Sequence, residues 1–338
     1  MDVDMFKPRT LTEAILKIRP TNTFFLDRFF GRTLTHNTLA IDVDVWKGKR
    51  KVAPYSRVGS KSTPLERQPF TTTPMNIPYI KLSRSLEPVQ CLLRTPGEAI
   101  YSSRTPADRA REQLAMDLED LNNAIKRAEE LQAAQALVNG VAIIKGEEID
   151  AEADYGRSGS HAYTVSTLWT AAGSDPGADL DAAALRISKD SGLTANVAVM
   201  GASALAAFLK HDLVRDQLDT ANGFYGSINA DKPAFNGATY YGRFRGLEIW
   251  GYNEWYLDDA DNTEKPLVPV DKVLVASTQA RNWRHYGPIM HMGSLIAEQR
   301  FVYSWKQEDP ACMMMAVHAA PLMVPHDVDA TCLLDVVA

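Results

Sequence analysis

The feature that most constrains the fold of this chain is one long amphipathic segment, residues 104–139. Thr105 is a residue type that caps helix N-termini, Pro106 suits the first helical position, and Gly140 is typical just past a helix end. At 1.5 Å per residue, about 34 residues would span about 50 Å. The pattern therefore predicts an unusually long helix with one buried face. Its apolar stripe consists of Leu114, Leu118, Leu121, Ile125 and Ala128.

The opposite face of this helix is charged and net acidic. Such a face is often merely solvated, but it also suits a basic segment of a second copy. Its basic residues are Arg109, Arg111, Lys126 and Arg127. Its acidic residues are Asp108, Glu112, Asp117, Glu119, Asp120, Glu129 and Glu130.

A basic segment lies between two strand-like stretches, residues 39–46 and 77–82. Residues 47–84 contain nine basic residues and one acid, so they carry a net charge of +8 against −14 for the rest of the chain. Because an isolated two-stranded ribbon is barely stable in water, the predicted finger must lie on its own domain or on the next subunit. The charge favours a polyanion or an acidic surface of another copy.

The N-terminal 40 residues predict an arm with little structure of its own. Residues 11–18 favour a short helix that ends at Pro20, and the first ten residues lack the apolar stretch of a secretory signal. Four phenylalanines and a leucine occur in residues 24–30. We expect these side chains to be buried against another element or a neighbouring subunit.

The remainder of the chain mixes helices and strands without a regular βαβ repeat, so we predict an α+β fold. Helices are expected at 180–191, with Asp179 or Asp181 near the N-cap, and at 203–218, with a bend near His211. An acidic patch occupies residues 147–154. Further strands are expected at 141–144, 149–155, 196–200, 238–250, 252–257, 265–270, 272–277, 313–324 and 331–337.

We find no convincing active site in the sequence. Ser203 follows a strand and opens a helix, as in the G-x-S-x-G elbow of a hydrolase, but the closing glycine of that motif is absent, and a role as helix cap explains the same residues. The acids at 258–264 favour a hairpin turn over a cation site, and the histidines show no zinc-ligand spacing. The composition is ordinary for a globular protein, with 45% apolar and 23% charged residues and no apolar run of 18. The three cysteines, predicted to be small buried hydrophobes, are Cys91, Cys312 and Cys332.

Three stretches resemble one family. Residues 273–287, VLVASTQARNWRHYG, resemble a block of the lambda-like phage major capsid proteins, the capsid protein E family. Residues 319–323, AAPLM, resemble a block near the C-terminus of that family, and residues 24–30 resemble its N-terminal aromatic segment. The order of arm, finger, long helix, mixed part and closing strands is also similar over nearly the whole chain.

The resemblance implies the HK97-type capsid fold, in which the finger is the extended E-loop and the long helix is the spine helix of a peripheral domain. An axial domain would meet its copies at the centres of hexamers and pentamers. The implied boundaries are 1–40 for the arm, 41–85 for the strand and E-loop, 86–178 with 311–338 for the peripheral domain, about 105–139 for the spine helix and 179–310 for the axial domain.

The resemblance also implies binding partners and a location in the cell and the virion. Copies would form an icosahedral head shell around double-stranded DNA, which they would not bind sequence-specifically, and the shell would assemble in the host cytoplasm before it becomes part of the virion. The family implies a portal protein and a scaffold protein in trans, because no long helical segment precedes the arm, and some relatives take a decoration protein. It implies no catalytic residue, cofactor, metal or membrane.

From the residues, we expect copies to associate head to tail, with the finger of one over the acidic helix and the 147–154 patch of the next. The arm phenylalanines would add apolar burial. A serine hydrolase using Ser203 and a nucleic-acid-binding module using residues 47–84 are the alternatives. The candidate inter-subunit contacts are Phe25, Phe29, Lys49, Arg50, Lys51, Arg57, Lys61, Asp117, Glu119, Asp120, Glu129 and Glu130.

Overall fold

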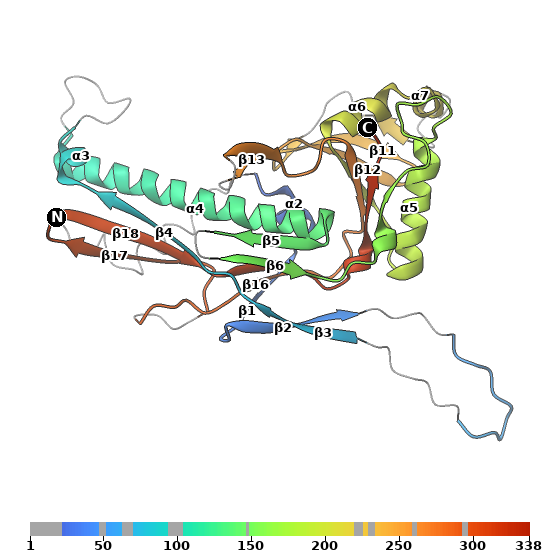
Figure 1. Cartoon of the computed structure of the whole chain (residues 1–338), viewed down its shortest axis with the longest axis horizontal. Coiled ribbons are helices and arrows are strands. Elements are labelled where there is room, and N and C mark those ends of the chain that lie inside the picture. The colour runs from blue at the N-terminus through green and yellow to red at the C-terminus, as the bar shows by residue number, and fades with distance from the viewer. Residues whose placement is uncertain are drawn as a thin grey trace.

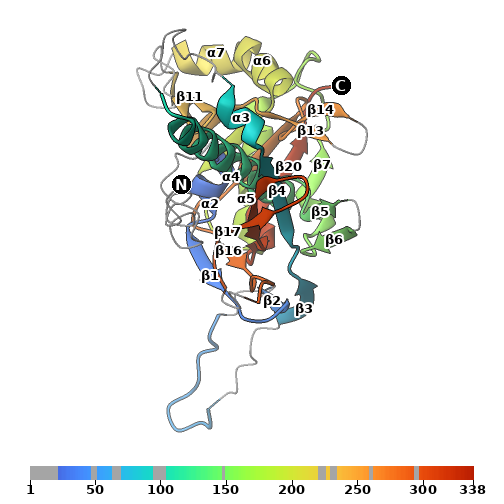
Figure 2. The same cartoon turned by 90° about the vertical axis from the view of Figure 1, so that its left-hand side faces the viewer.

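The computed structural model shows an elongated α+β molecule, with a long helix over strands at one end, a large sheet with flanking helices at the other, and a finger that projects from the body (Figure 1; Figure 2). The α+β prediction is confirmed. The structure describes residues 22–46, 52–62, 70–93, 104–146, 149–219, 226–228, 234–258, 262–292 and 297–338.

The predicted long helix is α4, Pro106–Val138, with 33 residues. The Thr105 hydroxyl accepts the Asp108 backbone N–H at 3.2 Å, and the Asp108 carboxylate accepts the Thr105 N–H at 3.1 Å, which is a capping box. Gly140 has a φ of +74°, the left-handed conformation expected where a helix ends. Both helix boundaries predicted from the caps are confirmed.

The apolar stripe of the first half of α4 packs on a three-stranded antiparallel sheet of order β17-β18-β4. Its strands are β17 (Phe301–Gln307), β18 (Cys312–Ala319) and β4 (Ile80–Leu86). The short helix α3, Pro88–Leu92, follows β4 near the start of α4. A second three-stranded sheet contains β1 (Arg32–Thr35), β16 (Asn282–Tyr286) and β19 (Pro321–Pro325), with β16 in the middle.

The large sheet has eight strands and is covered on both faces. Val197 and Val199 of β8 face the cluster that contains α2 and the end of α4, whereas Ala198 and Met200 face helix α5. This explains why its central strands read as continuous apolar runs. The strand path is β10 (Ala234–Phe235), β11 (Ala238–Phe244), β12 (Leu247–Tyr252), β8 (Val197–Met200), β15 (Lys272–Ala276), β20 (Thr331–Asp335) and β7 (Ala162–Thr164), with β9 (Gly226–Ile228) beside β11.

Strands β20 and β7 differ from the expected partition. The sequence-based boundaries grouped residues 331–335 and 162–164 with the long helix, but β20 pairs with β15 and β7 pairs with β20. The closing strand therefore belongs to the large sheet, because its residues Leu333 and Leu334 fill the two core clusters on either side of that sheet.

The helices beside the large sheet follow the predictions with small shifts. Helix α5 (Pro176–Asp190) begins four residues earlier than expected, because Asp175 is the N-cap and accepts the Ala178 N–H at 3.0 Å. The predicted bend near His211 divides α6 (Ala202–Lys210) from α7 (Asp212–Asp219). In the part of the chain that the structure describes, no helix is long and apolar enough to cross a membrane.

Three hairpins project from this body. The finger strands are β2 (Ala40–Trp46) and β3 (Phe70–Asn76), which pair antiparallel. The strand that pairs with β2 was expected at residues 77–82. In the structure that strand is β3, which ends at Asn76, and the next strand, β4, pairs with β18 instead. The others are β5 (Val141–Lys145) with β6 (Asp150–Asp154), and β13 (Trp255–Asp258) with β14 (Thr263–Pro266).

Candidate assembly surfaces

The finger tip is the most exposed part of the described chain. All residues from 52 to 62 are solvent-exposed, and Val52, Tyr55 and Val58 are exposed by 88% or more. The tip turns at Gly59, whose φ is +87°, and the Ser60 N–H donates to the Arg57 carbonyl at 3.0 Å. The finger tip thus leaves three apolar side chains in water in the single chain.

The base of the finger is attached firmly to the body. Ile41, Val43 and Met75 are buried in one cluster with Ala142 and Ala153 of the β5–β6 hairpin. Two of the predicted basic contacts, Arg57 and Lys61, lie at the exposed tip. The other three, Lys49, Arg50 and Lys51, lie outside the described residues, as does the predicted helix at 11–18.

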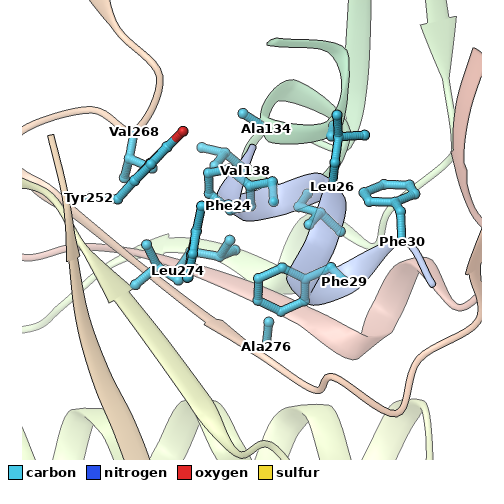
Figure 3. Packing of buried hydrophobic residues seen from close by; sticks show 14 of the residues in the cluster. Phe24, Leu26, Phe29, Phe30, Ala134, Val138, Tyr252, Val268, Leu274 and Ala276 are labelled. Atoms are coloured by element: carbon cyan, nitrogen blue, oxygen red, sulfur yellow. The ribbon is translucent and has the colours of Figure 1, made fainter. Parts of the chain in front are cut away.

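The aromatic arm segment forms the short helix α2, Phe24–Phe29. Figure 3 shows Phe24 and Phe29 among Val138 of α4 and Leu274 of the large sheet. Phe25 is 0% exposed and Phe29 is 3% exposed within the single chain. Of the two alternatives predicted for these rings, the structure shows burial against other elements of the same chain rather than exposure to a neighbouring subunit.

Glu130 holds this arm helix in place. Its carboxylate accepts the backbone N–H groups of Phe25 and Leu26, at 2.7 and 3.0 Å, and the hydroxyl of Tyr252 at 3.0 Å. Burial raises the pKa of Glu130 to about 7, although the hydrogen bonds oppose that shift. Glu130 thus links α2, α4 and β12 inside the protein, and its prediction as a surface contact is wrong.

Glu129 is also used inside the chain. Its two carboxylate oxygens each accept a bond of 2.8 Å from the Arg300 guanidinium, in a bidentate pair that is about 5% exposed on each side. The backbone carbonyl of Gln299 accepts a third bond from Arg300, at 2.7 Å. Glu129 is therefore unavailable to a second copy, contrary to the prediction.

The first half of α4 retains part of its acidic surface. Arg84 of β4 donates to Asp117 at 3.0 Å and to Asp120 at 2.9 Å. Asp117 is 3% exposed, so the prediction that it meets a neighbour is wrong. Glu119 and Asp120 are exposed, and they are the two predicted helix contacts that the fold leaves at the surface.

The β5–β6 hairpin carries the predicted acidic patch in exposed form. Asp150, Glu152 and Asp154 alternate along β6 and all are exposed. Within the described part of the chain, β6 pairs with β5 and with no other strand. Glu147 and Glu148 lie outside the described residues. This hairpin, together with Glu119 and Asp120, is the predicted acidic surface that the fold leaves exposed.

The side chains that a hydrolase would need have other roles in this fold. The N-cap of α6 is Gly201 and not Ser203, which lies in the first turn of the helix and donates its backbone N–H to the Val270 carbonyl. His285, a histidine downstream of Ser203 in the sequence, lies in β16 and is hydrogen-bonded to His36 and His326. Burial raises the pKa of the Cys332 thiol to about 11, which opposes a nucleophilic role.

The acidic turn at 258–264 also shows no cation site in the described residues. Asp258 accepts a bond from Lys265 at 2.6 Å, across the β13–β14 hairpin. Asp259 and Asp261 lie outside the described residues. Among the residues whose positions are given, no group of three or more histidine, cysteine or acidic side chains is arranged to hold a metal.

Comparison with known proteins gives one consistent answer. The family model described as phage major capsid protein E matches residues 7–336. The chain is 27% identical to the major capsid protein of Escherichia phage lambda over 90% of this chain and 91% of that protein. It is 28% identical to the major capsid protein of Enterobacteria phage P21 over 94% of each chain.

The fold agrees with these relatives. The structure superposes with a TM-score of 0.71 on a protein assigned as the capsid protein of an E. coli CFT073 prophage, at 22% identity over 97% of this chain and 96% of that one. It superposes with a TM-score of 0.53 on the capsid protein of cyanophage A-1(L), at 12% identity over 93% and 92%. The chain belongs to the phage major capsid protein E family and has the capsid fold of tailed phages.

Proposed function

We propose that this major capsid protein builds the phage head by passing its basic finger to an acidic surface of the next subunit. The observation that supports this most directly is the finger tip, where every described side chain from 52 to 62 is exposed and three of them are apolar. A ribbon of this kind gains stability only when another surface covers it.

The receiving surface is the β5–β6 hairpin together with Glu119 and Asp120 of α4. Its carboxylates are exposed, and they are opposite in sign to Arg57 and Lys61 of the tip. Charges at the edge of an interface set register and association rate, and salt screens them. The contact is heterologous, because the finger and its receiving surface are different parts of the chain, and such contacts close into rings.

The wider assembly is part of the same proposal. Rings of six and five copies form the icosahedral shell, which assembles in the host cytoplasm with a scaffold protein in trans, a portal protein and, on the outer surface, a decoration protein. The chain encloses double-stranded DNA without reading its sequence and catalyses no reaction. The peripheral domain contains 86–178 and 311–338, except that β7 and β20 belong to the large sheet of the axial domain, 179–310.

Substitution of the tip charges tests the contact. The variant Arg57→Gln/Lys61→Gln should fold normally, because both side chains are exposed, but should yield fewer closed shells by electron microscopy and sedimentation. Lys189→Gln/Lys210→Gln removes the same charge from exposed positions on α5 and α6 and serves as the matched control. Normal shells from the tip variant would refute the finger contact. Salt-sensitive binding of the free wild-type chain to DNA would instead favour a nucleic-acid-binding module.

A further inference from the structure

Three imidazole side chains form a continuous hydrogen-bonded chain beside the finger. His36 Nε2 lies 2.7 Å from His285 Nδ1, and His285 Nε2 lies 3.3 Å from His326 Nε2. The rings of His36 and His285 stack with their centroids 5.0 Å apart. His285 is 4% exposed and His326 is 8% exposed, so the chain runs from the half-buried His36 into the protein interior.

The histidine chain lies at the point where the finger leaves the body. Strand β1 pairs in parallel with β16, and Leu34 lies opposite His285. The backbone N–H of His36 donates to the Tyr286 carbonyl at 2.8 Å, just beyond the end of β1. Strand β2 of the finger begins four residues later, at Ala40. His36 is therefore fixed to the body by both its backbone and its ring, directly before the finger starts.

The hydrogen-bonding capacity of imidazole limits this chain to a low proton count. A neutral imidazole has one N–H and one lone pair, so three neutral rings place one hydrogen in each of the two links. One added proton can still be accommodated with one hydrogen in each link, but if it is on His285 the rings on both sides must present lone pairs. With a second added proton, at least one of the two ring-to-ring hydrogen bonds is lost, because two N–H groups then face each other there.

The surroundings of the chain also oppose added charge. Arg32 of β1 lies 4.8 Å over the Trp283 ring, and that ring lies tilted against His326 with centroids 4.4 Å apart. The acid beside His326 is Asp327, which Arg281 already holds at 2.6 Å. Burial, followed by the charges of the two neighbouring imidazoles, lowers the pKa of His285 to about 3.

The opposite face of β16 carries its own charges. Arg284 points to the arm helix and donates to the Phe30 carbonyl at 2.8 Å. Tyr286, on the same face, lies beside the Glu129–Arg300 ion pair, and burial raises its pKa. Arg284 and Tyr286 therefore have their partners on the side of β16 that faces the arm helix. The acid sensitivity of the contact between β1 and β16, here called the seam, depends on the histidines on the other side of β16.

We propose that His36, His285 and His326 form a proton-sensitive clamp that holds β1 against β16 directly before the finger begins. The clamp is closed when the three rings are neutral and is released on acidification. It concerns the finger root within one chain and stands independently of the shell contacts proposed above.

The sign and size of the effect follow from linkage. A histidine whose pKa is lowered in the closed seam favours closure fully above its free value of about 6.5, and closure weakens as the pH falls below that value. With the pKa of His285 at about 3, the equilibrium between closed and open seam shifts roughly tenfold towards open between pH 7.5 and pH 5.5.

Hydrogen exchange of the full unassembled chain tests the clamp. Protection of amides in residues 31–39, corrected for the intrinsic pH dependence of exchange, should fall roughly tenfold from pH 7.5 to 5.5, whereas protection in β8 should not change. In His285→Gln, whose amide still donates and accepts but does not titrate, the fall should be less than twofold. His318→Gln is the matched control, because His318 is buried in β18 and bonds Tyr79 at 2.5 Å, outside the chain of three.

Two results would overturn the proposal. One is unchanged protection of residues 31–39 in the wild type at pH 5.5, and the other is an equal loss in wild type and His285→Gln. If His285→Gln fails to fold, His285→Asn, whose shorter amide also does not titrate, makes the same test. Because the readout needs no shell, either negative result would leave the capsid function untouched.

Discussion

The buried carboxylate of Glu130 should make the stability of the subunit depend on pH in an unusual direction. Most native acids are more acidic than in the unfolded chain, and their contribution is lost as the pH falls. The pKa of Glu130 is instead raised from 4.5 to about 7, so between these values the folded state binds more protons than the unfolded state. Stability contributed by this site should therefore decrease as the pH rises through that window.

The size of the effect follows from the shift. Each pKa unit corresponds to about 1.4 kcal/mol, so a shift of this size is worth about 3 kcal/mol. In Glu130→Gln the side chain stays neutral and keeps one acceptor oxygen for the two N–H groups of α2. We expect this variant to resemble the protonated wild type near pH 5, within about 1 kcal/mol for the altered hydrogen bonds, and to be the more stable protein at pH 8.

Urea unfolding of both unassembled proteins, followed by tryptophan fluorescence from pH 5 to pH 8, measures this directly. The free energy of unfolding of the wild type minus that of Glu130→Gln should fall by about 3 kcal/mol across the range. Glu119→Gln, at an exposed position of the same helix, serves as the control and should give a flat difference. A flat or rising difference for Glu130→Gln would refute the reasoning, because it would mean that the three hydrogen bonds outweigh desolvation.

Other substitutions test the division between buried and exposed features. Arg300→Met leaves Glu129 buried without its partner and should destabilise the subunit by about 3–5 kcal/mol in urea unfolding, whereas no loss would contradict the importance of the pair. Phe25→Ala should cost about 3–4 kcal/mol by the same assay, because the ring is fully buried, while Val58→Ala should change subunit stability by less than about 0.5 kcal/mol yet reduce shell yield. Replacement of the three basic residues at 49–51 by glutamine should impair assembly without unfolding the subunit, as electron microscopy and circular dichroism would show; normal shells would contradict the charge argument.

Local features of the chain were predictable because their signals are local. The capping box at Thr105 and the glycine at position 140 define both ends of α4, and the break at His211 separates two helices as expected. These features depend on residues within a few positions of each other. The pairing of the finger strands was only partly predictable. The strand that pairs with β2 is β3 and not β4, because β4 pairs with β18, which lies more than 200 residues further along the chain.

The fate of the helix acids was misjudged for a reason that the sequence does contain. Glu129 stands four residues after Ile125, and Asp117 stands four residues before Leu121, so both lie in the apolar row rather than opposite it. A carboxylate in a buried row signals a buried cationic partner. What the sequence could not supply is the identity of that partner, since Arg300 pairs with Glu129 across 171 positions. The histidine chain is equally hidden, because positions 36, 285 and 326 form no pattern along the sequence.

Folding thus decides which charges remain available for assembly. Three of the five acids predicted to receive the finger are buried. Asp117 pairs with Arg84 of β4, Glu129 pairs with Arg300 just before β17, and Glu130 is bonded to the arm helix α2. These bonds join the three segments to the long helix. The basic tip and the β5–β6 carboxylates are exposed in the same molecule. Buried pairs are little affected by salt, whereas interactions between exposed charges are weakened by salt and are largely screened beyond about 10 Å at 0.1 M. Raising the salt concentration should therefore weaken the proposed contacts between subunits while it leaves each subunit folded.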